Sequence, residues 1–176
     1  MRRKDREITD FSRIMAIIEA CDCCRLGLVD QNKAYIVPMN FGYEINDEQL
    51  CLYFHCAAEG RKMELLPKQA VVSFEMDTNH ALAKGETGCE FSFLYQSVMG
   101  TGAVKEISEP DEKIHGLQKI MAHYTNKADW EFNGNLFSVT KVLKLSVSTL
   151  SCKEHQSFTD SGEAGGVLYQ KRSDVL

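Results

Sequence analysis

The sequence predicts a mainly β fold, an antiparallel barrel of about six strands with helices on its flanks. Three observations support this prediction. Short apolar or alternating segments recur along the chain, and turns separate most of them. Two segments, one near the start and one late in the chain, have the apolar periodicity of amphipathic helices. The strand–helix–strand alternation of a doubly wound parallel sheet is absent.

The composition fits one globular domain. The chain has 176 residues, of which 44% are hydrophobic, so a core can be buried without disulfides. A net charge of -5 disfavours nucleic acid as a partner but permits a small basic pocket for one phosphate group. No apolar stretch approaches the length of a membrane span, and the basic start has no apolar secretory segment behind it. Seven cysteines, an odd number, then favour a reducing cytoplasm with free thiols.

The first elements follow from capping and alternation. Thr9 or Asp10 caps a helix that runs to about Ala20, because the apolar residues between them form one stripe. Beyond this helix, β-type residues alternate with clusters of turn residues. The expected strands are 24–29, 34–41 and 50–55, with turns at 30–33 and 46–48.

The middle of the chain is more varied. One or two helical turns are expected over 59–66, closed by Pro67. A strand over 70–76 is followed by a polar stretch, 77–90, that we expect to be a long loop. Residues 91–107 have strand character but contain two glycines. Glycines within a strand indicate a bulge, a bend or the close approach of another group.

The last elements are a second helix and a final strand. Ser108 caps the helix, which begins near Pro110 and continues to Tyr124. An irregular connection over 126–135 precedes a half-buried strand over 143–149. The chain becomes polar after about Ser151. We expect a domain over residues 1–155 and a polar tail over 156–176, loosely held and docking through three residues. These residues are Val167, Leu168 and Tyr169.

Two groups of reactive side chains are weak candidates for a site. Cys21, Cys23 and Cys24 offer three thiols, but a metal needs four ligands and no second cysteine or histidine pair follows. We therefore expect some of these sulfurs to be packed as small hydrophobes and no metal to bind. His55 and Cys56 are neighbours on a strand, so their side chains point to opposite faces and do not form a nucleophile pair.

Arg61 and Lys62 are a stronger candidate. They follow Gly60 at the start of a short helical segment, where a guanidinium fork, a mobile ammonium and backbone N–H groups together suit one phosphate dianion. The alternative is two solvated cations on a helix. The position of His55 six residues before Arg61 favours a shared site.

The order of these motifs resembles the pyridoxamine 5′-phosphate oxidase-like flavin proteins, and within them the 5-nitroimidazole-resistance branch most closely. The resemblance covers about residues 1–155. Each motif by itself occurs in many unrelated proteins, but the order and spacing of the motifs together are fairly specific for this family. The segments that carry it are 36–43, 52–66, 71–75, 95–104 and 143–147.

This resemblance implies a six-stranded antiparallel split β-barrel that forms a homodimer and binds FMN at the subunit interface, with FAD as an alternative. Arg61 and Lys62 would hold the phosphate, with Arg61 the larger contributor. His55 would lie near the flavin ring, both to bind it and to act in catalysis. Four residues would run along the ring and two would complete the wall of the cofactor site. These are Pro38, Met39, Asn40 and Phe41, and then Ser97 and Val98.

The implied activity is a flavin-dependent oxidoreductase that reduces a nitro group on a nitroimidazole-type or other small substrate. His55 would donate a proton during that reduction. A non-catalytic flavin- or haem-binding protein of the same barrel is the alternative. Oxidation of pyridoxamine phosphate is disfavoured, because no substrate motif of that enzyme is recognisable near the C-terminus. The chain also departs from its relatives at 150–153, where Leu-Ser-Cys-Lys leaves any role of Lys153 open.

Overall fold

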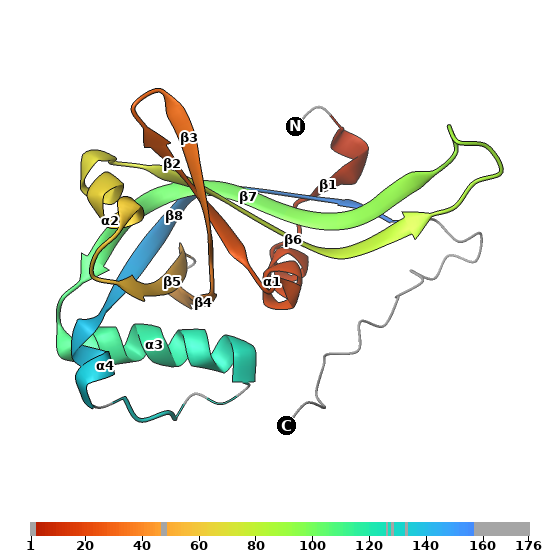
Figure 1. Cartoon of the computed structure of the whole chain (residues 1–176). Coiled ribbons are helices and arrows are strands. Elements are labelled where there is room, and N and C mark those ends of the chain that lie inside the picture. Colours follow the sequence, from red (N-terminus) through yellow and green to blue (C-terminus); the bar gives the residue numbers. More distant parts are fainter. Residues whose placement is uncertain (1–2, 47–48, 126, 128, 133, 157–176) are drawn as a thin grey trace.

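One antiparallel sheet organises the chain (Figure 1). The computed structural model describes residues 3–46, 49–125, 127, 129–132 and 134–156. Strands follow the order β3-β2-β6-β7-β8-β5-β4, and a short β1 pairs with β8. The predicted class, mainly β with flanking helices, is confirmed; the described sheet has eight strands where about six were expected. The strands are β1 Glu7–Ile8, β2 Cys24–Asp30, β3 Lys33–Met39, β4 Phe41–Asn46, β5 Gln49–Ala57, β6 Val72–Ala83, β7 Ser92–Ile107 and β8 Thr140–His155.

Four α-helices and two short 3-10 turns accompany the described sheet. The first helix begins as predicted, because the Asp10 carboxylate accepts a hydrogen bond from the backbone N–H of Arg13 at 2.7 Å. Its buried stripe of isoleucines packs into the barrel interior. The helices are α1 Phe11–Ala20, α2 Arg61–Leu65, α3 Pro110–Thr125 and α4 Gly134–Val139, and the 3-10 turns are Lys4–Arg6 and Leu66–Lys68.

The expected strand 34–41 is two strands instead of one. β3 ends at Met39 and β4 begins at Phe41, so Asn40 alone joins them. β3 and β4 are also the two ends of the strand order, which means that the chain crosses from one end of the sheet to the other at this residue. The apolar run through 34–41 gave no sign of the break, because both strands place apolar side chains toward the core.

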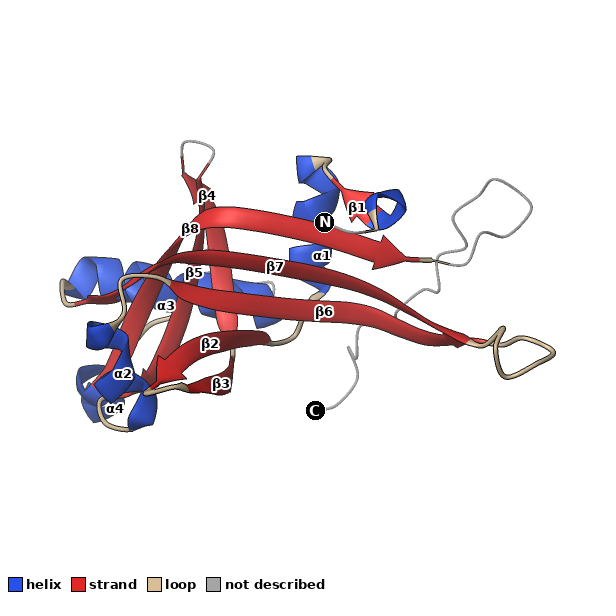
Figure 2. Ribbon diagram, turned by 90° about the horizontal axis from the view of Figure 1, so that it is seen from above, coloured by secondary structure: helices blue, strands red, loops and turns tan. Residues whose placement is uncertain are grey.

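The expected loop over 77–90 is wrong over its first half, 77–83, and confirmed over 84–90. β6 continues to Ala83 and β7 starts at Ser92, and the two form an arm that extends away from the body (Figures 1 and 2). Asn79 adopts a left-handed φ of 55° within a register shift between Thr78 and Ala81. The strands of this arm pack against no core, so their side chains need not alternate between apolar and polar. Without that alternation the sequence of an exposed strand resembles the sequence of a loop.

The two glycines of β7 mark a bulge and close contacts, as expected. The register between β7 and β8 shifts between Thr101 and Gly102. A Cβ on Gly102 would lie 2.3 Å from the carbonyl oxygen of Ser146, and one on Gly100 would lie 2.5 Å from the ring of Phe74. Only glycine fits at either position without movement of the neighbouring strand or ring.

β8 is longer than predicted and lies inside the sheet, between β7 and β5. It spans Thr140–His155 instead of 143–149, pairing with β5, β7 and β1 in turn. The polar residues Ser151, Lys153 and Glu154 hid its second half. α4 likewise occupies part of the connection expected to be irregular over 126–135. The docking predicted for Val167, Leu168 and Tyr169 falls outside the described residues.

α3 covers one face of β4 and β5 (Figure 1). A small second core lies between them and includes Tyr53, Leu117 and Val142. Two glycines allow the close packing. A Cβ on Gly116 would lie 2.8 Å from the Tyr53 ring, and a Cβ on Gly42 would lie 2.3 Å from the backbone of α3. The helix therefore rests directly on the strand next to the Asn40 crossing.

Candidate functional site

His55 faces α3 from the second half of β5. Its neighbours Phe54 and Cys56 belong to the barrel interior, whereas Tyr53 belongs to the core under α3. Because side chains alternate along a strand, His55 shares the α3 face with Tyr53 and lies opposite Cys56. There it borders a cavity of about 350 Å³. The cavity is lined by His55, Leu117, Ile120, Met121, Glu131, Phe132, Leu136, Phe137 and Thr140.

The electrostatic surroundings keep His55 neutral. His55 as a whole is exposed, but partial desolvation lowers the pKa of its imidazole, and the nearby positive charge of Lys62 lowers that pKa further. At neutral pH the ring therefore carries one N–H and one lone pair, and it can both donate and accept a hydrogen bond. The rest of the cavity wall is mostly apolar, apart from the carboxylate of Glu131 and the hydroxyl of Thr140.

Asn40 lies next to His55. The pair Phe41–Phe54 is the last of the ladder between β4 and β5, so Asn40 and His55 are the next residues on the two strands. The end of this ladder therefore sets the crossing beside the predicted catalytic histidine, and Lys62 is close enough to His55 to lower its pKa. We call Asn40, Phe41, His55 and Lys62 the crossing cluster. Phe41 is fully buried and Asn40 is exposed.

The two predicted phosphate ligands differ in their surroundings. The Arg61 guanidinium donates through Nε to Asp30 at 2.8 Å and through Nη1 to Glu64 at 2.9 Å. Both partners raise the pKa of Arg61. Lys62 makes no ion pair within the described residues. A phosphate would therefore bind Lys62 directly but would compete with two carboxylates for Arg61.

Pro38 and Met39 lie on opposite faces of β3. Met39 is buried in the core, whereas Pro38 is exposed and stands opposite Arg25 of β2. Arg25 forms ion pairs with Glu75 and with Asp77. Pro38 therefore borders a charged cluster on the outer face of the sheet, a neighbourhood that the sequence did not predict.

Ser97 and Val98 also point to opposite faces. Val98 is fully buried in the barrel interior, and Ser97 faces outward in register with Asp77 and Lys153. The Ser97 hydroxyl is buried and has no hydrogen-bond partner among the described residues. A buried hydroxyl of this kind indicates a missing partner, and a polar group of a ligand on this face fits that role. Val98 is a core residue with no exposed surface for a cofactor.

The predicted residues do not form one cluster within a single copy of the chain. Arg61 is bound to Asp30 at the end of β2, and Ser97 lies near the other end of that strand, beyond the row of Arg25. Arg25 is five residues from Asp30, which corresponds to roughly 17 Å along the strand. Arg61 and Ser97 therefore belong to separate groups of residues.

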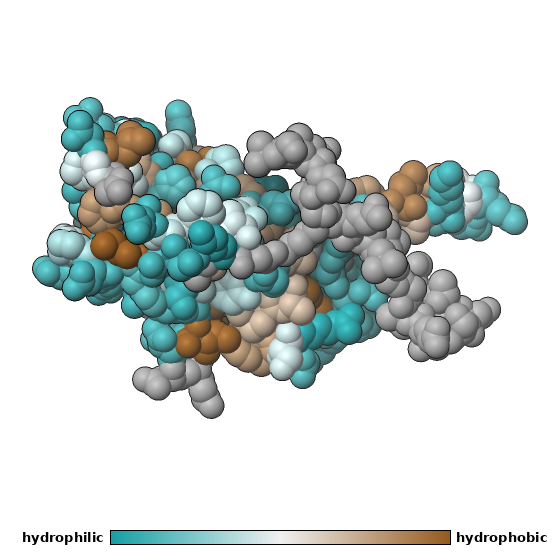
Figure 3. All heavy atoms as spheres, turned by 90° about the horizontal axis from the view of Figure 1, so that it is seen from below, coloured by the Kyte–Doolittle hydropathy of each residue, from teal (hydrophilic) through white to brown (hydrophobic). Residues whose placement is uncertain are grey.

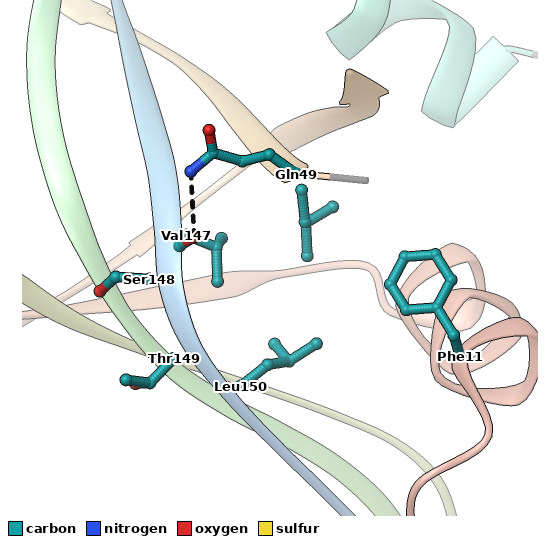
Figure 4. Close-up of a pocket in the computed structure, with 7 residues that line it drawn as sticks. Phe11, Gln49, Val147, Ser148, Thr149 and Leu150 are labelled. Carbon is teal, nitrogen blue, oxygen red and sulfur yellow. Dashed lines mark hydrogen bonds between the residues drawn. The ribbon is translucent and has the colours of Figure 1, made fainter. Parts of the chain in front are cut away.

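A second cavity of about 410 Å³ opens at the other end of the barrel (Figure 4). Phe11 of α1 faces Leu150 of β8 across it, and the Gln49 amide donates to the Val147 carbonyl at 3.3 Å. The lining has no charged side chain. The cavity thus lacks the cations that a phosphate needs.

Sequence reasoning missed two parts of the site. Asp30 was expected only as a turn residue, although it holds Arg61. Of the aromatic wall of the His55 cavity, Phe132 was assigned to an irregular connection, and Phe137, just beyond that connection, was assigned to no element. Only the excess of aromatic residues in that connection could have indicated it. The cysteines Cys21 and Cys24 are buried, and within the described residues no group of three or more His, Cys, Asp or Glu side chains is placed to hold a metal.

Comparison with known proteins identifies the family. The profile of the pyridoxamine 5′-phosphate oxidase family matches residues 10–154. A solved structure of a candidate 5-nitroimidazole antibiotic resistance protein from Bacteroides thetaiotaomicron is 36% identical, with a TM-score of 0.71. That match covers 84% of this chain and 86% of the other. The chain belongs to the pyridoxamine 5′-phosphate oxidase family. No curated protein matches it.

Two further members of this fold are more distant in sequence. The FAD and haem binding protein of Mycobacterium smegmatis has a TM-score of 0.74 at 18% identity, over 88% of this chain and 76% of that one. The flavocytochrome Anf3 of Azotobacter vinelandii has a TM-score of 0.72 at 19% identity, and the match covers 92% of this chain and 75% of that one. At these identities the likeness concerns the fold alone. In the described part of this family member, no helix is long and apolar enough to span a membrane.

Proposed function

We propose that this chain is a flavin-dependent oxidoreductase that binds FMN and reduces a nitro group on a small aromatic molecule such as a nitroimidazole. The observation that carries the proposal is the crossing cluster, where a neutral imidazole borders an apolar cavity beside a lysine with no ion pair in the described chain. The 36% identity to a candidate nitroimidazole-resistance protein supports the substrate class.

The residues fit an FMN in part. Lys62 suits the phosphate. Arg61 can be a second ligand if its guanidinium exchanges the hydrogen bond to Asp30 or Glu64 for one to the phosphate. The crossing at Asn40 offers backbone groups beside His55, and the unpartnered Ser97 hydroxyl can take a hydrogen bond from the outer face. When bound, the flavin would supply the electron transfer that no side chain of the protein provides. FAD is the alternative, with its adenylate lying outside the crossing cluster.

His55 would hydrogen-bond the substrate or transfer a proton to it. Nitro reduction consumes protons as well as electrons, and an imidazole at the cavity wall can donate a hydrogen bond to a nitro oxygen or transfer a proton to it. Because its pKa is lowered, the imidazolium form becomes abundant only on the acid side of the ordinary histidine range. Proton donation by His55 therefore makes reduction faster as the pH falls.

The outer face of the sheet suits a second copy of the chain. Ile36 and Met99 are exposed there by 64% and 49%, on the same face as the buried, unpartnered Ser97 hydroxyl. A homodimer would cover these side chains and would bring a second set of residues to the Ser97 face. We accordingly propose a homodimer with the flavin at its interface, in a reducing cytoplasm that leaves the seven thiols free. Sedimentation of the flavin-loaded protein tests this; a flavin-loaded monomer contradicts it.

The first experiment is to identify what the purified protein binds. Denaturation followed by mass spectrometry distinguishes FMN from FAD and haem, and we expect FMN. Reduced protein is then mixed with 2-methyl-5-nitroimidazole, and reoxidation is followed in a single turnover between pH 5 and 8. We expect the rate to rise toward low pH in the parent protein and to be slower and flatter in His55→Ala, with the flavin retained.

His115→Ala is the matched control, because it removes an imidazole from α3 outside the cavity. The proposal is overturned if the protein binds no flavin. The role of His55 is overturned if His55→Ala keeps the parent rate and pH profile. A Soret band in place of a flavin spectrum would instead support haem, since a neutral imidazole in an apolar cavity is also an iron ligand.

A further inference from the structure

The crossing at Asn40 has no strand neighbour to hold it. β3 and β4 lie at opposite ends of the strand order, and neither pairs with the other. The ladder between β4 and β5 ends with Phe41, and that between β2 and β3 ends with Met39. Asn40 therefore lies outside both ladders, although it adjoins His55. Something other than the sheet must fix its backbone.

The last turn of α3 supplies that contact. The backbone N–H of Phe41 donates to the phenol oxygen of Tyr124 at 3.2 Å, and the Tyr124 hydroxyl donates to the carbonyl oxygen of Asp22 at 2.8 Å. Phe41 is fully buried, so its N–H has no access to water and needs a partner. One hydroxyl thus links the start of β4 to the segment between α1 and β2.

A second contact beside it fixes the helix to the same segment. His123 Nε2 lies 2.9 Å from the carbonyl oxygen of Cys21, and its side chain is 3% exposed. The His123 ring also packs on Phe41, with the ring centroids 4.4 Å apart. Two successive residues of α3 therefore bind the two successive carbonyls of Cys21 and Asp22, so the helix end has little freedom to shift.

Gly42 allows α3 to pack this closely against the start of β4. It follows the crossing by two residues, and a Cβ there would lie 2.3 Å from the backbone of Lys119. The helix can therefore lie directly on β4, which brings the Tyr124 hydroxyl within reach of the Phe41 N–H. Burial raises the pKa of Tyr124, which keeps the phenol protonated and able to donate.

We propose that Tyr124 is a positioning residue for the flavin ring: its hydroxyl fixes the backbone at Asn40 and Phe41, along which the ring would lie. This inference rests on the proposed function, because it gives Tyr124 a role at the ring end of that same site. It differs from the predicted roles of Arg61 and Lys62, which concern the phosphate end. In this role Tyr124 would act through the backbone of Phe41.

Tyr124→Phe tests the inference, and Tyr43→Phe is its matched control. Tyr43 lies at the same interface, and its hydroxyl donates to Glu19 at 2.9 Å without touching the crossing. Each variant loses one hydroxyl and keeps its ring. In the flavin-free protein we expect amide exchange at Phe41 to be at least about tenfold faster in Tyr124→Phe than in Tyr43→Phe. Equal exchange in the two variants would overturn the proposal.

Ligand affinity gives the second readout. We expect Tyr124→Phe to weaken FMN and riboflavin by the same factor, several-fold, because both carry the ring. Lys62→Ala should weaken FMN alone. If the parent protein binds flavin and Tyr124→Phe binds both ligands as tightly as the parent, the positioning role is wrong while the proposed function stands. If the parent binds no flavin, the proposed function fails, and the role of Tyr124 toward the ring fails with it.

Discussion

Asp30 holds Arg61 through the Nε atom of its guanidinium, with donor and acceptor 2.8 Å apart. Glu64 binds the same guanidinium from the next turn of α2. The sequence makes Arg61 the larger phosphate ligand, because arginine offers a planar fork of donors. In the structure that fork is already occupied by carboxylates, so Lys62 becomes the principal candidate.

Removal of Asp30 should therefore favour phosphate binding. We expect Asp30→Asn to raise the affinity for FMN several-fold and to leave riboflavin unchanged, because the guanidinium no longer has to leave a carboxylate. The ion pair is exposed to solvent, so its loss should change the stability of the fold little. Calorimetric titration with both ligands measures the effect. A weaker affinity for FMN would show instead that Asp30 orients Arg61 for the phosphate.

Lys62→Ala should weaken FMN more than Arg61→Ala does. The loss of a charged hydrogen bond costs roughly 1.5–3 kcal/mol, which corresponds to about ten- to a hundredfold in affinity. Lys68→Ala is the control, since Lys68 is an exposed lysine on the neighbouring 3-10 turn. Fluorescence titration with FMN and riboflavin distinguishes the phosphate from the ring. The assignment fails if riboflavin binding falls as much as FMN binding.

The same variant should change the titration of His55. Lys62 lowers the pKa of the imidazole because its positive charge opposes protonation. Without that charge we expect the pKa of His55 to rise toward its ordinary value, although burial still holds it lower. Titration of the imidazole signals by NMR measures the change in Lys62→Ala and in the Lys68→Ala control. An unchanged His55 pKa would mean that the two side chains do not interact.

Acid should weaken the packing of α3 through Glu44. Burial acts to raise the pKa of this carboxyl, but hydrogen bonds from Tyr53 and His115 outweigh it and lower the pKa to about 2. Because the pKa is lower in the folded state, the ionised carboxylate stabilises the fold at pH values above 4.5, the pKa of this carboxyl in the unfolded chain. That contribution disappears as the pH falls toward 2. Urea midpoints at pH 7 and pH 3 measure the loss. Glu44→Gln should be less stable than the parent at pH 7 and closer to it at pH 3; a constant difference would contradict this.

The sequence predicted the elements that cover a core better than those that do not. α1 was placed to within a residue, because its cap and its buried stripe both leave a signal. The part of β6 that belongs to the arm was missed, because the exposed strand there has no apolar alternation, whereas the expected strand segment 91–107 matches β7. A hydrophobic patch nevertheless lies along the arm (Figure 3), where Leu82 and Phe93 are 56% and 53% exposed.

The site was predicted in part for a similar reason. Asn40 and His55 come to adjacent positions where the ladder between β4 and β5 ends. The pairing of Arg61 with Asp30 could not be predicted, because it depends on how α2 lies against the end of β2, some thirty residues earlier in the chain. Tyr124 was read only as part of an apolar helix face, and the hydrogen bonds of its hydroxyl depend on the crossing itself.

The place of β8 inside the sheet has a consequence for synthesis on the ribosome. β5 and β7 both pair with β8, and each is made well before it. Until Thr140 and the residues after it emerge, the nascent chain carries two strands with an unpaired edge, which are prone to wrong pairing with other chains. The barrel therefore cannot be completed gradually from the N-terminus. Its assembly waits for one late strand, and we expect chains stalled before β8 to depend on chaperones.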